Sequence, residues 1–201
     1  MVIVKSNRTA LGAVLAVALS GSAIADPLSD LLQKSGGGAC YTRVYDQAHL
    51  DKHPGQRATE VRVSLLPDEL DGGGAIIRVM LKLGKQANYV VGGCTWAVKA
   101  NLDITDQPII EEFKGPSGLN CYALTSEDGS SAEEGGDFPI DLKTGDPILL
   151  YLPEYIAAWP SFDRSGSADF LQLGSEDRVF RLNKSNALLC RGMEEKLPWL
   201  L

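Results

Sequence analysis

The amino-acid sequence predicts an all-β protein in which about eight antiparallel strands form a meander barrel, with a β-sandwich as the alternative. Three observations favour this class. Apolar and polar residues alternate along several segments, turn signatures separate these segments, and no segment is long enough for a crossover helix. Alternation with one polar face is typical of antiparallel sheets, and short connections between successive segments favour the barrel over the sandwich.

The chain opens with the three-part pattern of a secretory signal peptide. Lys5 and Arg8 precede an apolar run at 10–19, and Ala23-Ile24-Ala25 then provides the small-x-small pattern of a cleavage site. The apolar run is too short to cross a bilayer, which takes about 20 residues. We therefore expect residues 1–25 to be a signal peptide and the mature protein to be periplasmic or secreted.

A short helix is expected at the start of the mature chain. Leu28, Leu31 and Leu32 have the i, i+3, i+4 spacing of an amphipathic helix within residues 26–34. A glycine-rich joint then extends to residue 39. Residues 40–201 are expected to form a single disulfide-bonded β domain.

The predicted strands follow from period-2 alternation of apolar residues. Val61, Val63 and Leu65 share one face of the first strand, and the turn at 67–74, PDELDGGG, separates it from the next. The strands expected on this basis are 61–65, 77–83, 94–100, 119–125, 138–142, 147–152, 168–173 and 180–182.

The charge balance argues against nucleic-acid and anionic-membrane partners. Lys5 and Arg8 are two of the 19 basic residues, so 17 remain without the leader against 26 acidic residues, a formal net charge of −9. Binding to a phosphate backbone needs clustered Lys and Arg side chains, and anionic membranes attract basic segments. No later stretch is long and apolar enough for a membrane-spanning helix.

The four cysteines predict two disulfides, because an even number of cysteines in an exported chain is typical of a disulfide framework. Cys94 and Cys121 fall on the inward faces of neighbouring predicted strands, which predicts that they pair. Cys40 and Cys190 lie just before the first predicted strand and just after the last. These strands are neighbours in a closed barrel, so this pair would join the chain ends. A metal site is the alternative, but no cysteines have C-x-x-C spacing.

His49 and His53 are the only histidines and stand four residues apart. On a helix this spacing places both imidazoles on one face, and Asp46 or Asp51 would add an oxygen ligand for a metal ion. No glutamate follows His49, so the zinc-protease signature is absent, and Pro54 ends any helix. Two ligands are too few for a metal site, so we expect a structural turn and no cofactor.

The acidic segment 126–137, SEDGSSAEEGGD, lacks the regular ligand spacing of a calcium loop. We interpret it as a solvated hairpin loop, which would also offer an anionic contact surface to a cationic envelope protein. Adjacent glutamates on a strand face opposite sides, and no G-x-S-x-G motif is present. No catalytic residue is therefore assigned.

Two segments carry a resemblance to a known family. Residues 40–56 read CYTRVYDQAHLDKHPGQ, and residues 176–182 read EDRVFRL and are followed by Cys190. They resemble segments of a family of small exported bacterial proteins of uncharacterised function, which open with a similar Cys-Tyr…Tyr-Asp-x-x-His-Leu-x-x-His-Pro stretch. The resemblance covers most of the mature chain, and it implies a disulfide-bearing β fold and no activity.

Three functional hypotheses remain. The first is a non-catalytic cell-envelope module that binds or inhibits another protein. Exported lysozyme inhibitors are similar in size and design, and Ser165-Gly166-Ser167 resembles the Ser-Gly loop that some of them insert into an enzyme cleft. The alternative is a barrel that carries a small apolar ligand, since eight strands are able to enclose one small molecule. The last is a metal-dependent hydrolase centred on His49 and His53.

Overall fold

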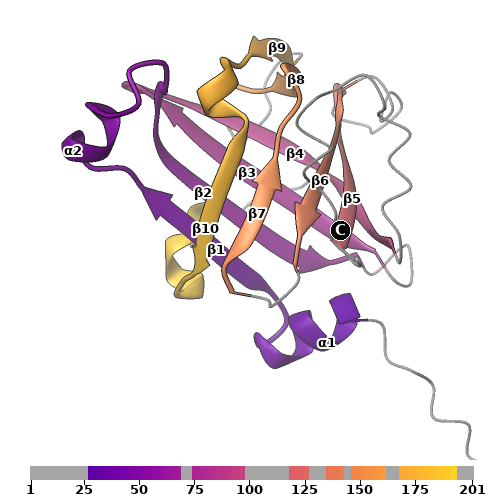
Figure 1. Cartoon of the computed structure of the whole chain (residues 1–201). Helices are drawn as coiled ribbons and strands as arrows, with labels where there is room; N and C mark the ends of the chain where they lie inside the picture. The colour runs from indigo at the N-terminus through magenta and orange to yellow at the C-terminus, as the bar shows by residue number, and fades with distance from the viewer. Residues whose placement is uncertain are drawn as a thin grey trace, which may run out of the picture.

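The structure is a computed structural model that describes residues 27–68, 74–97, 118–126, 135–142, 146–161 and 168–193. Eight strands close into an antiparallel barrel in the order β1-β10-β7-β6-β5-β4-β3-β2 (Figure 1). The predicted barrel is confirmed, and the β-sandwich alternative is wrong. The barrel strands are β1 (Ala39–Val44), β2 (Ala58–Pro67), β3 (Ala75–Leu83), β4 (Gln86–Ala97), β5 (Gly118–Ala123), β6 (Asp137–Asp141), β7 (Ile148–Tyr151) and β10 (Val179–Lys184).

The remaining elements lie outside the barrel wall. A separate two-stranded sheet contains β8 (Tyr155–Ala158) and β9 (Asp169–Gln172). The helical elements are α1 (Pro27–Lys34), α2 (Gln47–Leu50) and the short 3-10 helices η2 (Ser175–Asp177), η3 (Ala187–Leu189) and η4 (Arg191–Met193). The helix expected at 26–34 is therefore present as α1. None of the helices in the described ranges has both the length and the apolar character needed to cross a bilayer.

Two long stretches of barrel strand lie outside the predicted strands. No strand is predicted at β1, which contains Cys40, and β4 starts at Gln86 instead of residue 94. Both segments are buried on both faces: Cys40 and Tyr41 are buried in β1, as are Val90 and Val91 in β4. A segment that is covered on both faces has no alternation to detect. Residues 98–100 of the predicted strand lie outside the described residues.

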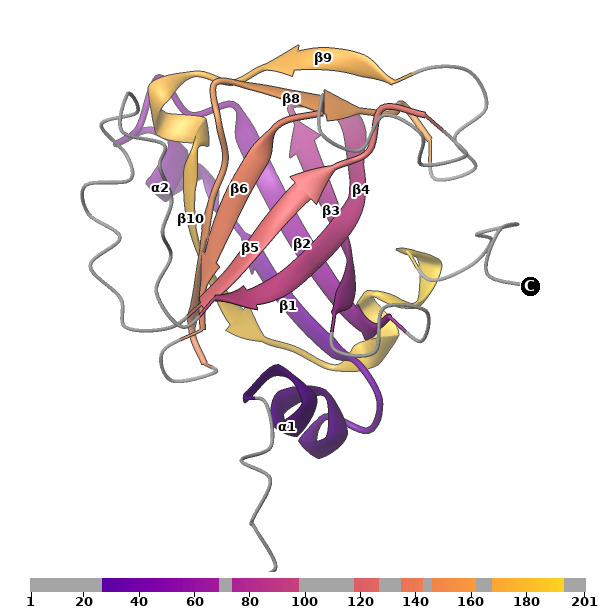
Figure 2. The same ribbon diagram turned by 90° about the vertical axis from the view of Figure 1, so that its right-hand side faces the viewer.

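The strand predicted at 168–173 is not part of the barrel. It forms β9, which pairs with β8 in the separate sheet, and the eighth barrel position is occupied by β1. β8 itself was not predicted, because Ile156, Ala157 and Ala158 are all buried and leave no polar alternation. The β8–β9 sheet lies across one end of the barrel, and α1 lies at the opposite end (Figure 2).

Buried side chains from every barrel strand form one contiguous core. Each barrel strand contributes at least one side chain that is 0 or 1 % exposed, namely Tyr41, Val63, Ile77, Val90, Leu119, Phe138, Leu150 and Phe180. Leu28 and Leu32 of α1 extend this core at one end, and Ile156 of β8 extends it at the other.

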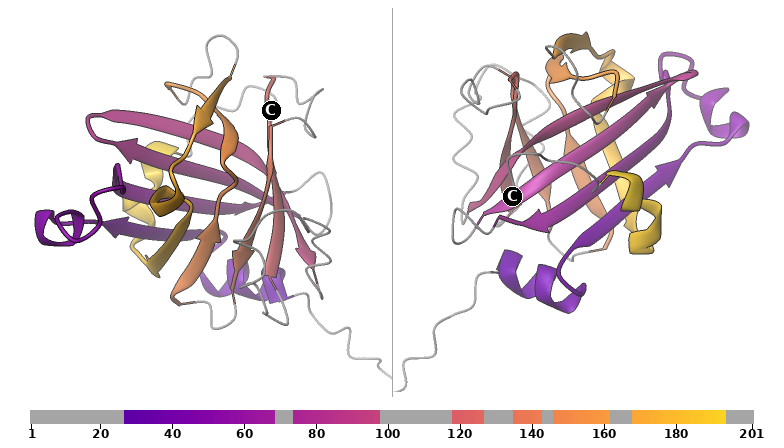
Figure 3. Two further views of the ribbon diagram at one scale, coloured as in Figure 1. Left: turned by 45° about the horizontal axis from the view of Figure 1, so that its top comes forward. Right: turned by 180° about the vertical axis from the view of Figure 1, so that it is seen from behind.

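Two disulfides join the pairs of cysteines that the sequence predicts. Cys94 bonds to Cys121, which is also its register partner across β4 and β5. Cys40 of β1 bonds to Cys190, and this bond packs with Met80 and Met193. The segment that holds η3 and η4 lies against the outside of the barrel (Figure 3, right), so the second disulfide fixes the chain after β10 onto β1.

β4 and β5 approach each other so closely at Gly92 that no side chain fits there. A Cβ atom at this position would overlap the carbonyl oxygen of Tyr122. We expect Gly92→Ala to lower the free energy of unfolding by about 1–3 kcal/mol, because backbone atoms of a paired strand do not move aside freely. Gly192→Ala is the matched control, since a Cβ atom there meets nothing within 4 Å. Urea unfolding measures both variants, and equal losses would contradict the close approach.

Tyr41 makes the stability of the barrel sensitive to alkaline pH. Burial, with a smaller contribution from Asp146, raises the pKa of Tyr41 to about 12. Below about pH 10 the phenol is protonated in both the folded and the unfolded states. Between about pH 10 and 12 the folded protein keeps the proton while the unfolded chain loses it, so the free energy of unfolding falls as the pH rises.

The expected loss across this interval is roughly 2–3 kcal/mol, at about 1.4 kcal/mol per pKa unit. Urea unfolding at about pH 9 and about pH 12 measures it. Tyr41→Phe should make the loss clearly smaller, whereas Tyr155→Phe should retain it because Tyr155 is exposed. If the two variants lose the same free energy between these pH values, Tyr41 is not the group responsible.

Candidate functional site

A wedge opens in the barrel wall where β1 and β10 diverge. The ladder between these strands consists of the pairs Tyr41↔Lys184 and Thr42↔Asn183. Beyond them, β1 continues along β2 toward α2, whereas β10 pairs with β7 from Val179 onward (Figure 1). A pocket of about 370 Å³ lies between the diverging strands.

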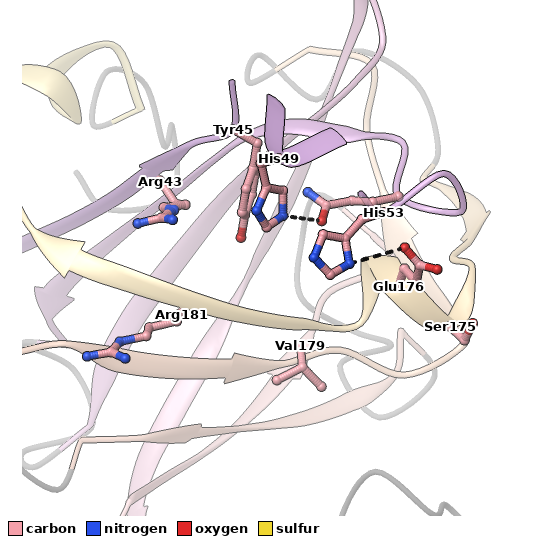
Figure 4. Close-up of a pocket in the computed structure, with 9 residues that line it drawn as sticks. Arg43, Tyr45, His49, His53, Ser175, Glu176, Val179 and Arg181 are labelled. Atoms are coloured by element: carbon pink, nitrogen blue, oxygen red, sulfur yellow. Dashed lines mark hydrogen bonds and ion pairs between the residues drawn. The ribbon is translucent and has the colours of Figure 1, made fainter. Parts of the chain in front are cut away.

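This pocket, which we call the wedge pocket, is lined by side chains from both strands and from the turns beside them. Its lining residues are Arg43, Tyr45, His49, His53, Gln56, Ser175, Glu176, Val179 and Arg181 (Figure 4). His49 and His53, which the sequence predicts to lie close together, therefore both line the wedge pocket.

The local sequence brings the two imidazoles together. The Asp46 carboxylate caps α2 by accepting a hydrogen bond from the backbone N–H of His49 at 2.8 Å. The Asp51 carboxylate accepts a hydrogen bond from the Gln47 amide at 2.8 Å. The rings of His49 and His53 then stack with centroids 4.4 Å apart and planes 23° apart. Both aspartates that the sequence suggests as metal ligands are thus engaged in local hydrogen bonds.

Tyr45 connects the wedge pocket to the barrel core. Its ring lies 4.7 Å from the His49 ring and 6.4 Å from the ring of Phe180, which is buried inside the barrel. The Arg43 guanidinium lies 5.5 Å from the Tyr45 ring centroid, within cation–π range. Burial raises the pKa of Tyr45, the Arg43 charge lowers it, and the Asp177 charge raises it. The phenol is therefore held in its neutral form.

Each imidazole has one nitrogen engaged by a neighbouring side chain. The Gln56 amide donates to the Ala58 carbonyl oxygen at 2.8 Å, so its own oxygen is free to accept from His49 Nε2 at 3.0 Å. His49 therefore carries a hydrogen on Nε2. His53 Nδ1 lies 3.6 Å from Glu176 Oε2 (Figure 4). These contacts fix the orientation of both rings.

Asp177 anchors the wall of the wedge pocket that carries Glu176. Its side chain is fully buried and accepts hydrogen bonds from the backbone N–H groups of Arg57 and Ala58, at 2.9 and 2.8 Å. The Arg57 guanidinium also donates to it at 3.2 Å. These bonds attach η2 to the start of β2, which places Glu176 beside His53.

The wedge pocket has the opposite charge from the chain as a whole. Arg43 and Arg181 appear in none of the ion pairs formed among the described residues. Glu176 is the acidic side chain in the lining, so with neutral imidazoles the lining carries a net charge of +1. The whole chain carries −7. A cationic pocket on an acidic protein is suited to an anionic group.

The other sequence candidates divide into those that the structure describes and those that it does not. Within the described ranges, no group of three or more His, Cys, Asp or Glu side chains is arranged to hold a metal ion. Most of the acidic segment 126–137 lies outside the described residues, as do the Ser165-Gly166-Ser167 loop and the expected signal peptide. Trp159 is buried, and Trp96 packs against the core rather than lining the wedge pocket.

Sequence reasoning missed Arg43, Gln56, Arg181 and Asp177 as site residues. Isolated arginines carry no motif, and these two line one pocket only because β1 and β10 close the barrel.

Comparison of the chain with models of known families, with curated proteins and with solved structures finds no match. The family resemblance of residues 40–56 therefore stays a prediction.

Proposed function

We propose that the protein is a non-catalytic binding module of the cell envelope that engages a protein partner through the wedge pocket. The observation that carries this proposal is the presence of Arg43 and Arg181 on the two sides of an open wedge, outside the ion pairs of the described residues. Arginine is favoured in binding sites because its guanidinium presents several donors in a fixed geometry. Val179, an exposed apolar residue beside Arg181, adds contact area.

The arrangement of the polar groups supports binding rather than chemistry. His49 donates to Gln56, and His53 lies against Glu176, so these groups orient one another. The barrel beneath them has a buried apolar core and is crosslinked by two disulfides, so it provides a rigid support. A pre-organised surface of this kind loses little conformational entropy when a partner binds.

The proposed location is the periplasm or the cell exterior. Disulfides persist in oxidising compartments, and the two described here fit such a location. We propose that residues 1–25 direct export and are removed. The partner is then another exported or envelope protein.

Affinity capture from an envelope extract tests the proposed function. We expect the wild-type protein to retain a partner that Arg181→Glu loses, because the substitution reverses a charge on the wall of the wedge pocket. Arg191→Glu is the matched control, since Arg191 is an exposed arginine outside the wedge pocket. A partner that both variants retain, or no partner at all, would argue against the proposal.

An assay of lysozyme activity in the presence of the protein tests the inhibitor form of the hypothesis. Inhibition that Arg181→Glu abolishes would identify the wedge pocket as the inhibitory surface. Inhibition that is unchanged in this variant would place that surface elsewhere.

A further inference from the structure

We infer that the wedge pocket binds a single carboxylate group, supplied by an acidic side chain of the partner. This inference rests on the proposed function and names the chemical group that the pocket recognises. It follows from the charge of the lining, from the position of the two arginines and from the character of the remaining surface.

The charge of the lining selects an anion with one negative charge. Arg43 and Arg181 contribute two positive charges, and Glu176 removes one. A carboxylate neutralises the remainder, whereas a phosphate group carries more than one negative charge at neutral pH and would leave an excess of negative charge in the lining. Like charges at such a site oppose binding.

The two arginines lie at the same end of the wedge pocket. They come from the two strands that diverge at the wedge, and both guanidinium groups lie on the side away from Glu176 (Figure 4). Guanidinium groups bind carboxylates through short, charge-assisted and often bidentate hydrogen bonds. Arg43 also lies over the Tyr45 ring, which restricts its motion before a ligand arrives.

The remaining lining suits the hydrocarbon part of an acidic side chain. Val179 and the Tyr45 ring provide apolar surface beside the arginines, and the stacked imidazoles extend it. The pocket volume of about 370 Å³ is near the lower end of ligand sites in proteins. It therefore has room for one anchoring side chain of a larger partner.

The histidines provide a built-in reporter for the test. His49 and His53 are the only histidines in the chain, and both line the wedge pocket, so imidazole signals in an NMR spectrum report on this site alone. The probe is N-acetyl-glutamate methylamide, which has one side-chain carboxylate. The matched glutamine compound has nearly the same shape and no charge, and inorganic phosphate tests the competing anion.

We expect the glutamate probe to shift the imidazole signals in a saturable manner, with a dissociation constant at least about tenfold lower than those of the glutamine compound and of phosphate. Arg43→Gln and Arg181→Gln should each weaken binding of the glutamate probe by about tenfold, while Arg191→Gln should leave it unchanged. Unchanged unfolding midpoints would show that the variants are folded.

Equal binding of the glutamine compound, tighter binding of phosphate, or no saturable shift would overturn the inference. Capture of a partner that depends on Arg181, together with any of these results, would leave the proposed function intact and remove only the carboxylate assignment. Failure of the capture experiment alone would remove the proposed partner and leave a carboxylate site that the NMR titration has demonstrated.

Discussion

Replacement of both Cys40 and Cys190 by alanine is expected to lower the free energy of unfolding by about 5 kcal/mol. This disulfide spans 150 residues, so in the chain-entropy model its loss releases a large conformational entropy in the unfolded state. It also attaches the chain that follows β10 to β1, and these two strands share only two residue pairs among the described residues. The disulfide and this short ladder together hold the β1–β10 seam closed.

The matched control is the double variant Cys94→Ala/Cys121→Ala. That disulfide spans 27 residues, and the same model gives a loss of about 3–4 kcal/mol. Extensive pairing along β4 and β5 also remains to hold those strands together. Urea unfolding of both double variants measures the difference. A larger loss for the Cys94–Cys121 variant would contradict the view that the β1–β10 seam is the weak point of the barrel.

Replacement of Asp177 by alanine is expected to cost about 2–4 kcal/mol of unfolding free energy, at about 1–3 kcal/mol for each buried donor that loses its acceptor. The fully buried carboxylate is the acceptor for two backbone N–H groups and for the Arg57 guanidinium. Without it, the two backbone N–H groups lose their acceptor, and unpaired buried donors are costly. The Arg57 side chain is 52 % exposed, so its guanidinium keeps access to water. Thermal or urea unfolding at neutral pH measures the loss.

Asp177→Asn should cost less than Asp177→Ala, because an amide oxygen still accepts hydrogen bonds but carries no charge for Arg57. Glu176→Ala serves as the neighbouring control, since its side chain is 39 % exposed and its contact with His53 is 3.6 Å long. Its loss should stay below about 1 kcal/mol, as for exposed ion pairs. If Glu176→Ala costs as much as Asp177→Ala, the anchoring role belongs to η2 as a whole rather than to Asp177.

The sequence predicts those strands in which apolar residues alternate with polar ones. β2 and β10 alternate clearly, and their positions follow from Val61, Val63 and Leu65 in one strand and Phe180 and Leu182 in the other. Period-2 reasoning fails for β1, the first half of β4, and β8, because other elements cover their outer faces. Whether another element covers the outer face of a strand depends on the tertiary structure, so the local sequence pattern does not reveal it.

The candidate site shows the same division between local and long-range information. The spacing of His49 and His53 within one short segment predicts their proximity, and the stacked rings agree with it. The other wall of the wedge pocket comes from residues more than 120 positions later in the chain, Ser175 to Arg181. No local pattern indicates that Arg181 will line the same pocket as Arg43, because this requires the barrel to close.

Site-specific photocrosslinking in the host cell tests the central claim, that a partner binds at the wedge pocket, most directly. A photoreactive phenylalanine analogue replaces Val179, which lines the wedge pocket and is 41 % exposed, or Phe170, which is 59 % exposed on β9. We predict a protein adduct from position 179 that disappears when Arg181→Glu is added, and none from position 170. An adduct from position 170 with none from position 179 would contradict the wedge pocket as the binding site.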